Sequence, residues 1–386
     1  MFTERKTFWA IGLAAICIAL LLITRMPAHP STRPRPVVLK LSAEQMKGQH
    51  RSPVGQPKPL VEEKVKNAQA VGSATESEPK FVRTALPRIG ARARHRPWVQ
   101  ASYGPGEDQL GFGHLGGGGE VFPPQGFDVT PDGKLLVLDS NKMRLVRYDQ
   151  GGRIEKTLPL SGLAMPADVT VTADGTIVVV DHAGVQTQGL QLLDTNGRLK
   201  AKWPQIQSGM MTGLYSVGND VYFANDLVTE KAGDSSGHAN SDITGIYEND
   251  DDDVVAGFIA PDGRTVVSAG IDDFEGGKFF VEAVRGETPE LLFTRHYQAP
   301  TRLQLLPYVQ SDDQGRIYVV LVEEALTVLL CVDGKTGDPV GSAELPASHG
   351  TDYGTPFRQY AVVASGGLVY QQLTDQGATY GWFNCH

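Results

Sequence analysis

A tight turn recurs six times in the C-terminal part of this chain, and its spacing constrains the fold more than any other feature. Each copy places Gly or Asn beside Asp or Ser and is followed by β-branched and other apolar residues. Gly and Asn accept the positive φ that a tight hairpin turn needs, and the alternating apolar residues suit strands packed between sheets. The turns are marked by Gly133, Gly175, Asp220, Gly263, Gly315 and Gly366, with spacings of 42, 45, 43, 52 and 51 residues.

This period predicts one four-stranded blade per turn, and therefore an all-β, six-bladed β-propeller over residues 98–386. Helical periodicity is absent after residue 60. The last blade is short, because residues 357–386 have room for only three strands. We expect residues 98–103, WVQASY, to supply its outer strand and to close the ring.

The first two repeats carry a family resemblance. YGPGEDQLGF followed by FPPQGFDVTPDGKLLVLDSNKMRLVRYDQGGRI resembles an NHL repeat, and MPADVTVTADGTIVVVDHAGVQTQGLQLLDTNGRL is similar. The later four repeats keep the spacing but lose the V-x-D-S strand, so the whole is similar to a TolB-like propeller with NHL-like first blades. The resemblance implies a scaffold that serves binding and sensor modules, lactonases and lyases, and it does not choose among them.

The N-terminus predicts a membrane anchor over residues 1–24. Residues 8–24 contain no charge, and as a helix they would extend roughly 25 Å, enough to cross a hydrocarbon core. A cleaved signal peptide is the alternative. The positive charges after the span favour the opposite orientation, but a short N-terminus before an apolar run is typical of a signal anchor. We therefore expect a single-pass protein with an extracytoplasmic propeller, periplasmic or extracellular.

Charge divides the remainder of the chain. Residues 25–97 carry 15 basic and 5 acidic side chains, net +10, whereas residues 98–386 carry 18 basic and 38 acidic, net −20. The basic segment is rich in Pro and predicts a disordered linker. It is either a solvated tether or a segment that binds anionic lipid, a cell-wall polymer or the acidic propeller itself. The acidic propeller argues against nucleic acid as a partner. We expect a monomeric propeller.

Candidate site residues lie near the starts of the innermost strands, at the mouth of the propeller channel. They could be metal ligands or acid–base groups facing cationic side chains that hold an anionic substrate. Alternatively, these polar residues are solvated or pair with one another across the channel. The candidates are Asp128 and Asp168 in the first two blades, Arg302 and Gln304 in the fifth, and Arg358 and Tyr360 in the sixth.

No cofactor is expected from the residue pattern. The Glu, Asn and Asp ligands of the related lactonases cannot be matched here, and the histidines are scattered, so we predict no zinc site. His182 is expected in a solvated loop. The acidic run Asp250–Asp253 predicts a solvated loop or, alternatively, a weak Ca²⁺ site.

Two further predictions concern a pair of cysteines and a Gly- and Ser-rich segment. Cys331 and Cys385 are expected to be buried free thiols, or alternatively a bridge that locks the ring. Residues 231–242, KAGDSSGHANSD, are expected to form a long mobile insertion in the third blade.

No phosphate loop, nucleophile elbow or kinase signature is present. We therefore predict a membrane-tethered binding or scaffolding module for a protein or saccharide partner, in preference to an enzyme. The alternative is a metal-dependent hydrolase or lyase of the lactonase type.

Overall fold

The computed structural model describes ten stretches of the chain, all of them in one compact unit that spans Val38–His386. The described residues are 81–83, 91–92, 94–114, 121–184, 187–206, 213–225, 228–240, 254–286, 290–348 and 356–385.

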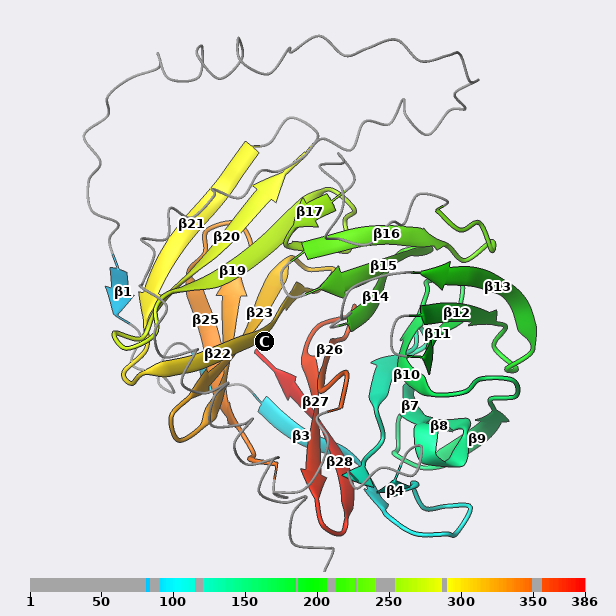
Figure 1. Cartoon of the computed structure of the whole chain (residues 1–386). Coiled ribbons are helices and arrows are strands. Elements are labelled where there is room, and N and C mark those ends of the chain that lie inside the picture. The colour runs from blue at the N-terminus through cyan, green and yellow to red at the C-terminus, as the bar shows by residue number, and fades with distance from the viewer. Residues whose placement is uncertain are drawn as a thin grey trace, which may run out of the picture. The chain divides into compact units, whose positions relative to one another are not determined.

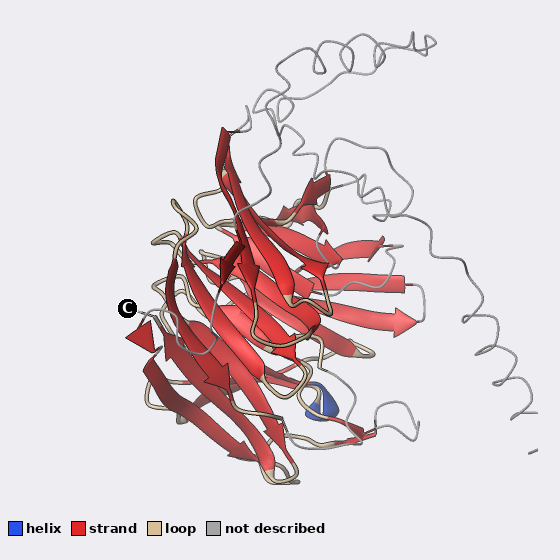
Figure 2. Cartoon of the chain, turned by 90° about the vertical axis from the view of Figure 1, so that its left-hand side faces the viewer, coloured by secondary structure: helices blue, strands red, loops and turns tan. Residues whose placement is uncertain are grey.

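Six sheets, each built on four antiparallel strands, form the blades of a propeller, which confirms the predicted all-β architecture (Figures 1 and 2). The only helix among the described residues is a short 3₁₀ turn, η1 (Ser140–Lys142). A small hairpin, β4 (Gly113–His114) and β5 (Val121–Phe122), precedes the first blade.

From the innermost strand outward, the first three blades are β6 (Gly126–Val129), β7 (Leu135–Asp139), β8 (Arg144–Tyr148) and β9 (Ile154–Pro159); β10 (Pro166–Val171), β11 (Ile177–Gly184), β12 (Thr187–Leu193) and β13 (Leu199–Ile206); and β14 (Gly213–Val217), β15 (Asp220–Asn225), β16 (Val228–Asp234) and β17 (Val254–Ala256). The other three are β18 (Phe258–Ile259), β19 (Thr265–Asp273), β20 (Lys278–Arg285) and β21 (Glu290–Gln298); β22 (Leu303–Ser311), β23 (Arg316–Glu323), β24 (Thr327–Asp333) and β25 (Pro339–Leu345); and β26 (Tyr360–Val362), β27 (Leu368–Thr374), β28 (Gly377–Asn384) and β3 (Arg94–Ser102).

The core lies between neighbouring blades. In the described part of the chain, six hydrophobic clusters occupy the six junctions of the ring, one cluster at each. A second strand such as β7 is buried on both faces, because a neighbouring blade covers each face. An outermost strand such as β9 reads IEKTLP and is largely exposed. The apolar runs in the sequence are therefore the middle strands of the blades.

The predicted turns have the expected conformation. Gly133, Gly175, Gly263 and Gly315 have φ of 73°, 82°, 66° and 77°, which an L side chain rarely adopts. The preceding aspartates hold these turns, as when the Asp262 carboxylate accepts bonds from the backbone N–H groups of residues 264 and 265, at 2.9 and 2.8 Å.

The ring closes as predicted. β3 pairs antiparallel with β28, from Ser102 opposite Gly377 to Arg94 opposite Asn384, and it supplies the outer strand of the last blade. Cys331 of the fifth blade and Cys385 after β28 are joined in a disulfide. The expectation of two free thiols is thus wrong, because the two cysteines face each other across the junction of the last two blades, with Cα atoms 6.4 Å apart.

The predicted linker contributes strands to the propeller. β1 (Phe81–Arg83) pairs in parallel with β21, and β2 (Ala91–Arg92) pairs in parallel with β25. The prediction of disorder is therefore wrong for residues 81–83 and 91–92, which form strands. The propeller also begins earlier than predicted, because β3 starts at Arg94 and not at residue 98. The outer edge of a blade offers unpaired N–H and C=O groups, and a passing segment can satisfy them whatever its composition.

Other expectations concern residues outside the described set. These are the apolar span 8–24, most of the linker and the acidic run Asp250–Asp253. Within the described residues, no helix is long and apolar enough to span a membrane.

The described part of the supposed insertion, residues 231–240, is not a mobile loop. It continues β16 and then turns tightly. Ser235 Oγ donates to Asp174 at 2.8 Å, and Trp203 Nε1 donates to the Gly237 carbonyl at 3.1 Å. These bonds fasten the turn to the second blade, which composition alone could not reveal.

Candidate functional site

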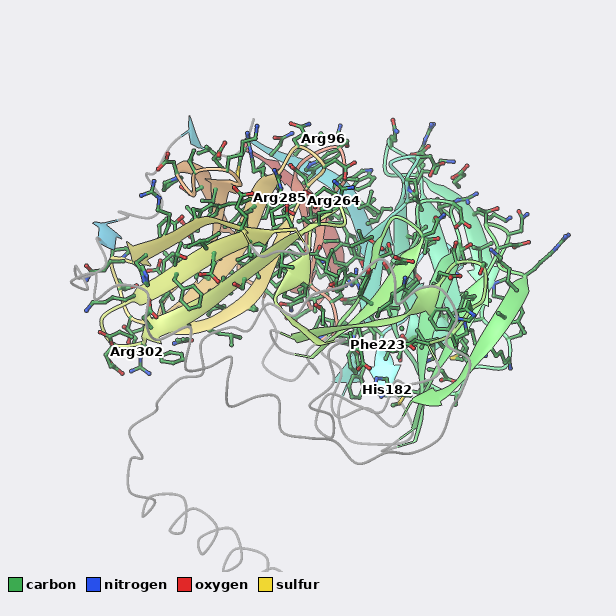
Figure 3. The ribbon with its side chains drawn as sticks, turned by 90° about the horizontal axis from the view of Figure 1, so that it is seen from above. Arg96, His182, Phe223, Arg264, Arg285 and Arg302 are labelled. Atoms are coloured by element: carbon green, nitrogen blue, oxygen red, sulfur yellow. A yellow bond between two sulfur atoms is a disulfide. The ribbon has the colours of Figure 1, made fainter. Side chains whose placement is uncertain are left out.

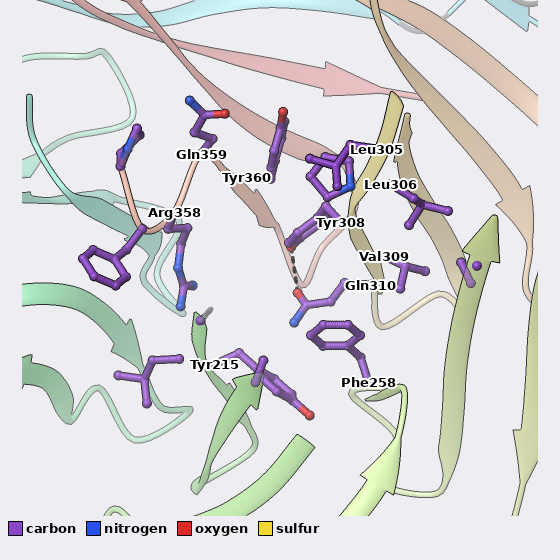
Figure 4. A pocket seen from close by; sticks show the side chains of 18 of the residues that line it. Tyr215, Phe258, Leu305, Leu306, Tyr308, Val309, Gln310, Arg358, Gln359 and Tyr360 are labelled. Atoms are coloured by element: carbon purple, nitrogen blue, oxygen red, sulfur yellow. Dashed lines mark hydrogen bonds between the residues drawn. The ribbon is translucent and has the colours of Figure 1, made fainter. Parts of the chain in front are cut away.

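A cavity of about 500 Å³ lies on the channel side of the third to sixth blades. The innermost strands β14 and β22 form much of its wall, together with the end of β19 and the segment 356–360 that leads into β26 (Figure 4). The sequence predicts a site at the mouth of the channel, near the starts of the innermost strands.

Aromatic and aliphatic side chains dominate the lining. Tyr308 lies between blades, with its ring centroid 5.5 Å from that of Tyr360, and the Tyr215 and Phe258 rings are 5.6 Å apart. Burial raises the pKa of Tyr215, Tyr308 and Tyr360, so all three are uncharged at neutral pH. The aromatic part of the cavity wall is therefore uncharged.

Apolar surface continues from the cavity to solvent. Phe274 and Leu305 both line the cavity, and they are 50% and 55% exposed. Large apolar side chains this exposed beside a cavity are typical of a binding site, whereas scattered ones carry little meaning. We call Phe274 and Leu305 the apolar rim.

Few of the described residues that line the cavity are polar, and two of them form a hydrogen bond with each other. The Tyr308 hydroxyl donates to Gln310 Oε1 at 2.8 Å (Figure 4). It also accepts from the Val362 backbone N–H at 3.0 Å. Gln359 also lines the cavity. The amide nitrogen of Gln310, the side chain of Gln359 and Arg358 remain as polar groups that could contact a ligand.

Arg358 is the one charged side chain among the described residues that line the cavity. Its Nε and Nη2 donate to Asp168 Oδ1 and Oδ2 at 3.1 and 3.0 Å, a bidentate ion pair. Its Nη1 lies 4.0 Å from Asp128 Oδ1. The segment before β26 thus reaches past the first blade to the second.

The two aspartates also bond neighbouring blades to each other. Asp168 Oδ1 accepts from its own strand, from Val169 N–H, while Oδ2 accepts from Leu214 N–H of the third blade, each at 2.8 Å. Asp128 Oδ2 accepts from Val171 N–H of the second blade at 2.9 Å and from the Thr170 hydroxyl at 2.8 Å. Both carboxylates therefore act as cross-links between innermost strands.

Burial raises the pKa of the fully buried Asp168 carboxyl, and the charge of Arg358 opposes this effect. The pKa of Arg358 is also raised: its burial favours the neutral form, but the two carboxylates outweigh that effect. Arg358 is therefore charged, and its bidentate geometry is that of an ion pair.

The candidate residues divide into two groups. Arg358 and Tyr360 line the cavity, and Asp128 and Asp168 lie beside it as partners of Arg358. Arg302 and Gln304 are exposed and do not line it; Arg302 Nη1 lies 3.5 Å from Glu275. Four of the six candidates thus lie at or beside the cavity.

The residues missed were apolar. Tyr308, Phe258 and the rim residue Phe274 carry no catalytic signature in sequence. β22 shifts register between Leu305 and Tyr308, and this irregularity brings consecutive residues 305–310 to the cavity. An alternating strand pattern could not have predicted it.

The aspartates do not fit the role of metal ligands. Each Asp168 oxygen already accepts two hydrogen bonds, and Asp128 is bonded to backbone N–H groups through both oxygens. Within the described residues, no three His, Cys, Asp or Glu side chains converge as a metal site requires. His182 lies in β11 and not in a loop, with its ring centroid 4.9 Å from that of Phe357, and Figure 3 shows it well apart from Arg302.

Comparisons with known proteins assign no family. No family model matches the chain, and no curated protein matches it. Among solved structures, the chain is similar to a protein of unknown function from Bacteroides caccae, with 9% sequence identity and a TM-score of 0.34. That alignment covers 57% of this chain and 86% of the other. The geometry of the cavity must therefore carry the functional argument.

Proposed function

We propose that the propeller is a binding module whose site is the cavity at the channel mouth. The observation that carries this proposal is the apolar rim, because Phe274 and Leu305 remain exposed beside a cavity of about 500 Å³. Ligand sites in proteins are concave, mostly apolar and supplied with a few polar groups. The hydrolase alternative is less well supported, since its candidate ligands Asp128 and Asp168 are occupied.

The wider setting of this module is part of the same proposal. The apolar run 8–24 supports an uncleaved anchor that places the propeller outside the cytoplasm. The first two repeats support kinship with NHL-like and TolB-like propellers. The partner is a protein or a saccharide, and the apolar rim favours a protein that inserts apolar groups.

Site-specific photocrosslinking in the native membrane tests the proposal. The photoreactive residue p-benzoylphenylalanine would replace Leu305 on the rim, and in a matched control it would replace Leu291, which is 58% exposed on the outer strand β21. We expect discrete products from position 305 that position 291 does not give. Phe274→Ser should remove these products, since it deletes apolar area without disturbing a buried side chain.

Identical products from both positions, or none from position 305, would overturn the assignment of the site. Extraction of the membranes with alkaline carbonate tests the anchor separately. Release of the full chain into the soluble fraction would contradict the tethering without touching the cavity.

A further inference from the structure

We infer that the group bound inside this cavity is an uncharged apolar ring system with one or two hydrogen-bond acceptors. This inference rests on the proposed function and adds the chemical class of the group that enters. It is based on the net charge of the cluster formed by Arg358, Asp128 and Asp168, and on the small number of polar groups among the described lining residues.

The charge of Arg358 is more than balanced. Asp168 pairs with it through two hydrogen bonds of 3.1 and 3.0 Å, and Asp128 lies 4.0 Å from Nη1. Two carboxylates and one guanidinium leave the cluster with a formal charge of −1. An anionic ligand would therefore meet net repulsion and would have to compete with Asp168 for the guanidinium.

Solvent screens this cluster weakly. The side chains of Arg358, Asp128 and Asp168 are 11%, 13% and 0% exposed. Charges in such surroundings interact more strongly than at a surface, and an ionised ligand would also lose its hydration on entry. Both effects disfavour an anion, and the loss of hydration disfavours a cation as well, so a neutral ligand fits this site best.

Arg358 can still donate one hydrogen bond. Nε and Nη2 donate to Asp168, whereas the one contact of Nη1 among the described residues is the long 4.0 Å approach to Asp128. A carbonyl or amide oxygen could accept from Nη1 without displacing either carboxylate. The amide of Gln310, whose oxygen already accepts from Tyr308, offers a second donor.

The aromatic side chains that line the cavity favour a ligand with flat apolar rings. The aromatic pairs Tyr308–Tyr360 and Tyr215–Phe258 flank the cavity, and flat apolar groups pack well against such faces. A saccharide would bring many hydroxyl groups to a wall with few partners for them, which costs binding free energy. The fit is to an aromatic amide, ester or ketone, or to the same group carried by a larger partner.

Naphthamide and naphthoate, with the same ring substitution, test the inference as a nearly isosteric pair that differs in charge. Titration calorimetry on the full chain in detergent should show naphthamide binding about tenfold or more tightly than naphthoate at neutral pH. Asp128→Asn, which brings the cluster to neutrality, should reduce that preference.

A cavity-filling variant locates the binding. Gly213 lines the cavity, and a Cβ there would lie 3.8 Å from Ala224 Cβ, an ordinary contact. Gly213→Val should therefore fold and bind naphthamide more weakly. Gly113→Val, on the β4–β5 hairpin where a Cβ also has room, is the matched control and should bind as the wild type does.

The outcomes separate the two proposals. Tighter binding of naphthoate, weakened by Gly213→Val, would overturn the neutral-ligand inference and leave the binding site standing. No binding of either probe, with crosslinks still formed at position 305, would overturn the inference alone. No binding and no crosslinks would overturn both.

Discussion

Replacing Asp168 with Ala tests the polar cluster on which the site depends. The substitution leaves the Arg358 guanidinium, only 11% exposed, without its bidentate partner, and it removes the acceptor of two backbone N–H groups. Breaking a buried ion pair from one side costs about 3 to 5 kcal/mol. We expect about 4 kcal/mol, because Asp128 stays within 4.0 Å of Arg358 and continues to offset its charge.

The assay is urea unfolding of the full chain in detergent, with a thermal melt beside it. At roughly 2 °C per kcal/mol for a domain of this size, the melting temperature should fall by about 8 °C. A double-mutant cycle with Arg358→Met isolates the pair. Removing both charges should cost less than the sum of the single changes, by about 2 kcal/mol.

Glu275→Ala is the comparison for an exposed pair. Its partner Arg302 lies 3.5 Å away, and both side chains are largely exposed, so the free energy of unfolding should change by no more than about 0.5 kcal/mol. The reasoning is refuted if Asp168→Ala changes it as little as Glu275→Ala, or if the cycle shows no coupling.

Three further predictions concern the scaffold. Reduction of the Cys331–Cys385 bridge, which closes 54 residues of sequence, should cost about 4 kcal/mol in the chain-entropy model, and a Cys331→Ser/Cys385→Ser variant should melt at the same temperature with or without reductant. A chain that starts at Arg94 should stay monomeric in size-exclusion chromatography. A chain that starts at Tyr103 should aggregate, because β28 loses its partner strand β3. Equal behaviour of the two chains would contradict the closure of the ring by β3. Although burial alone would raise the pKa of the Asp262 carboxyl in its turn, hydrogen bonds from residues 264 and 265 outweigh this effect and lower the pKa. The ionised carboxylate therefore stabilises the fold above about pH 4, and this contribution is lost as the pH falls further. Asp262→Asn should make the free energy of unfolding, measured with urea, depend less on pH in this acidic range.

The blades could be predicted from sequence because their signals are local. An Asp-Gly turn such as that at Gly133 fixes a hairpin within a few residues, and the apolar run after it identifies a middle strand. The short last blade then required an extra strand, and the segment from Trp98 was available to form it. The pairing of β1 with β21 could not be predicted, since the exposed edge of the partner strand determines it and the composition of residues 81–83 does not.

The site shows the same division between local and distant information. Sequence placed Asp128 and Asp168 on innermost strands, and they are there. Their roles depend on groups far along the chain: Val171 N–H for the first, and Leu214 N–H and Arg358 for the second. A sequence separation of 190 residues between Asp168 and Arg358 leaves no pattern that a reading of one chain could detect.

The pairing of Arg358 also bears on how the cavity could bind. Arg358 belongs to the sixth blade, its backbone N–H donates to the Gln125 carbonyl before the first blade at 3.1 Å, and its side chain reaches the second. Asp168 in turn is bonded to Leu214 in the third blade, which lines the cavity. Two segments of the cavity lining, from the third and the sixth blade, are thus joined through the Asp168 carboxylate. Because such a site needs little ordering on binding, affinity should come from the apolar fit and from Arg358 Nη1, and loosening the chain at Asp168 should weaken binding even where the fold survives.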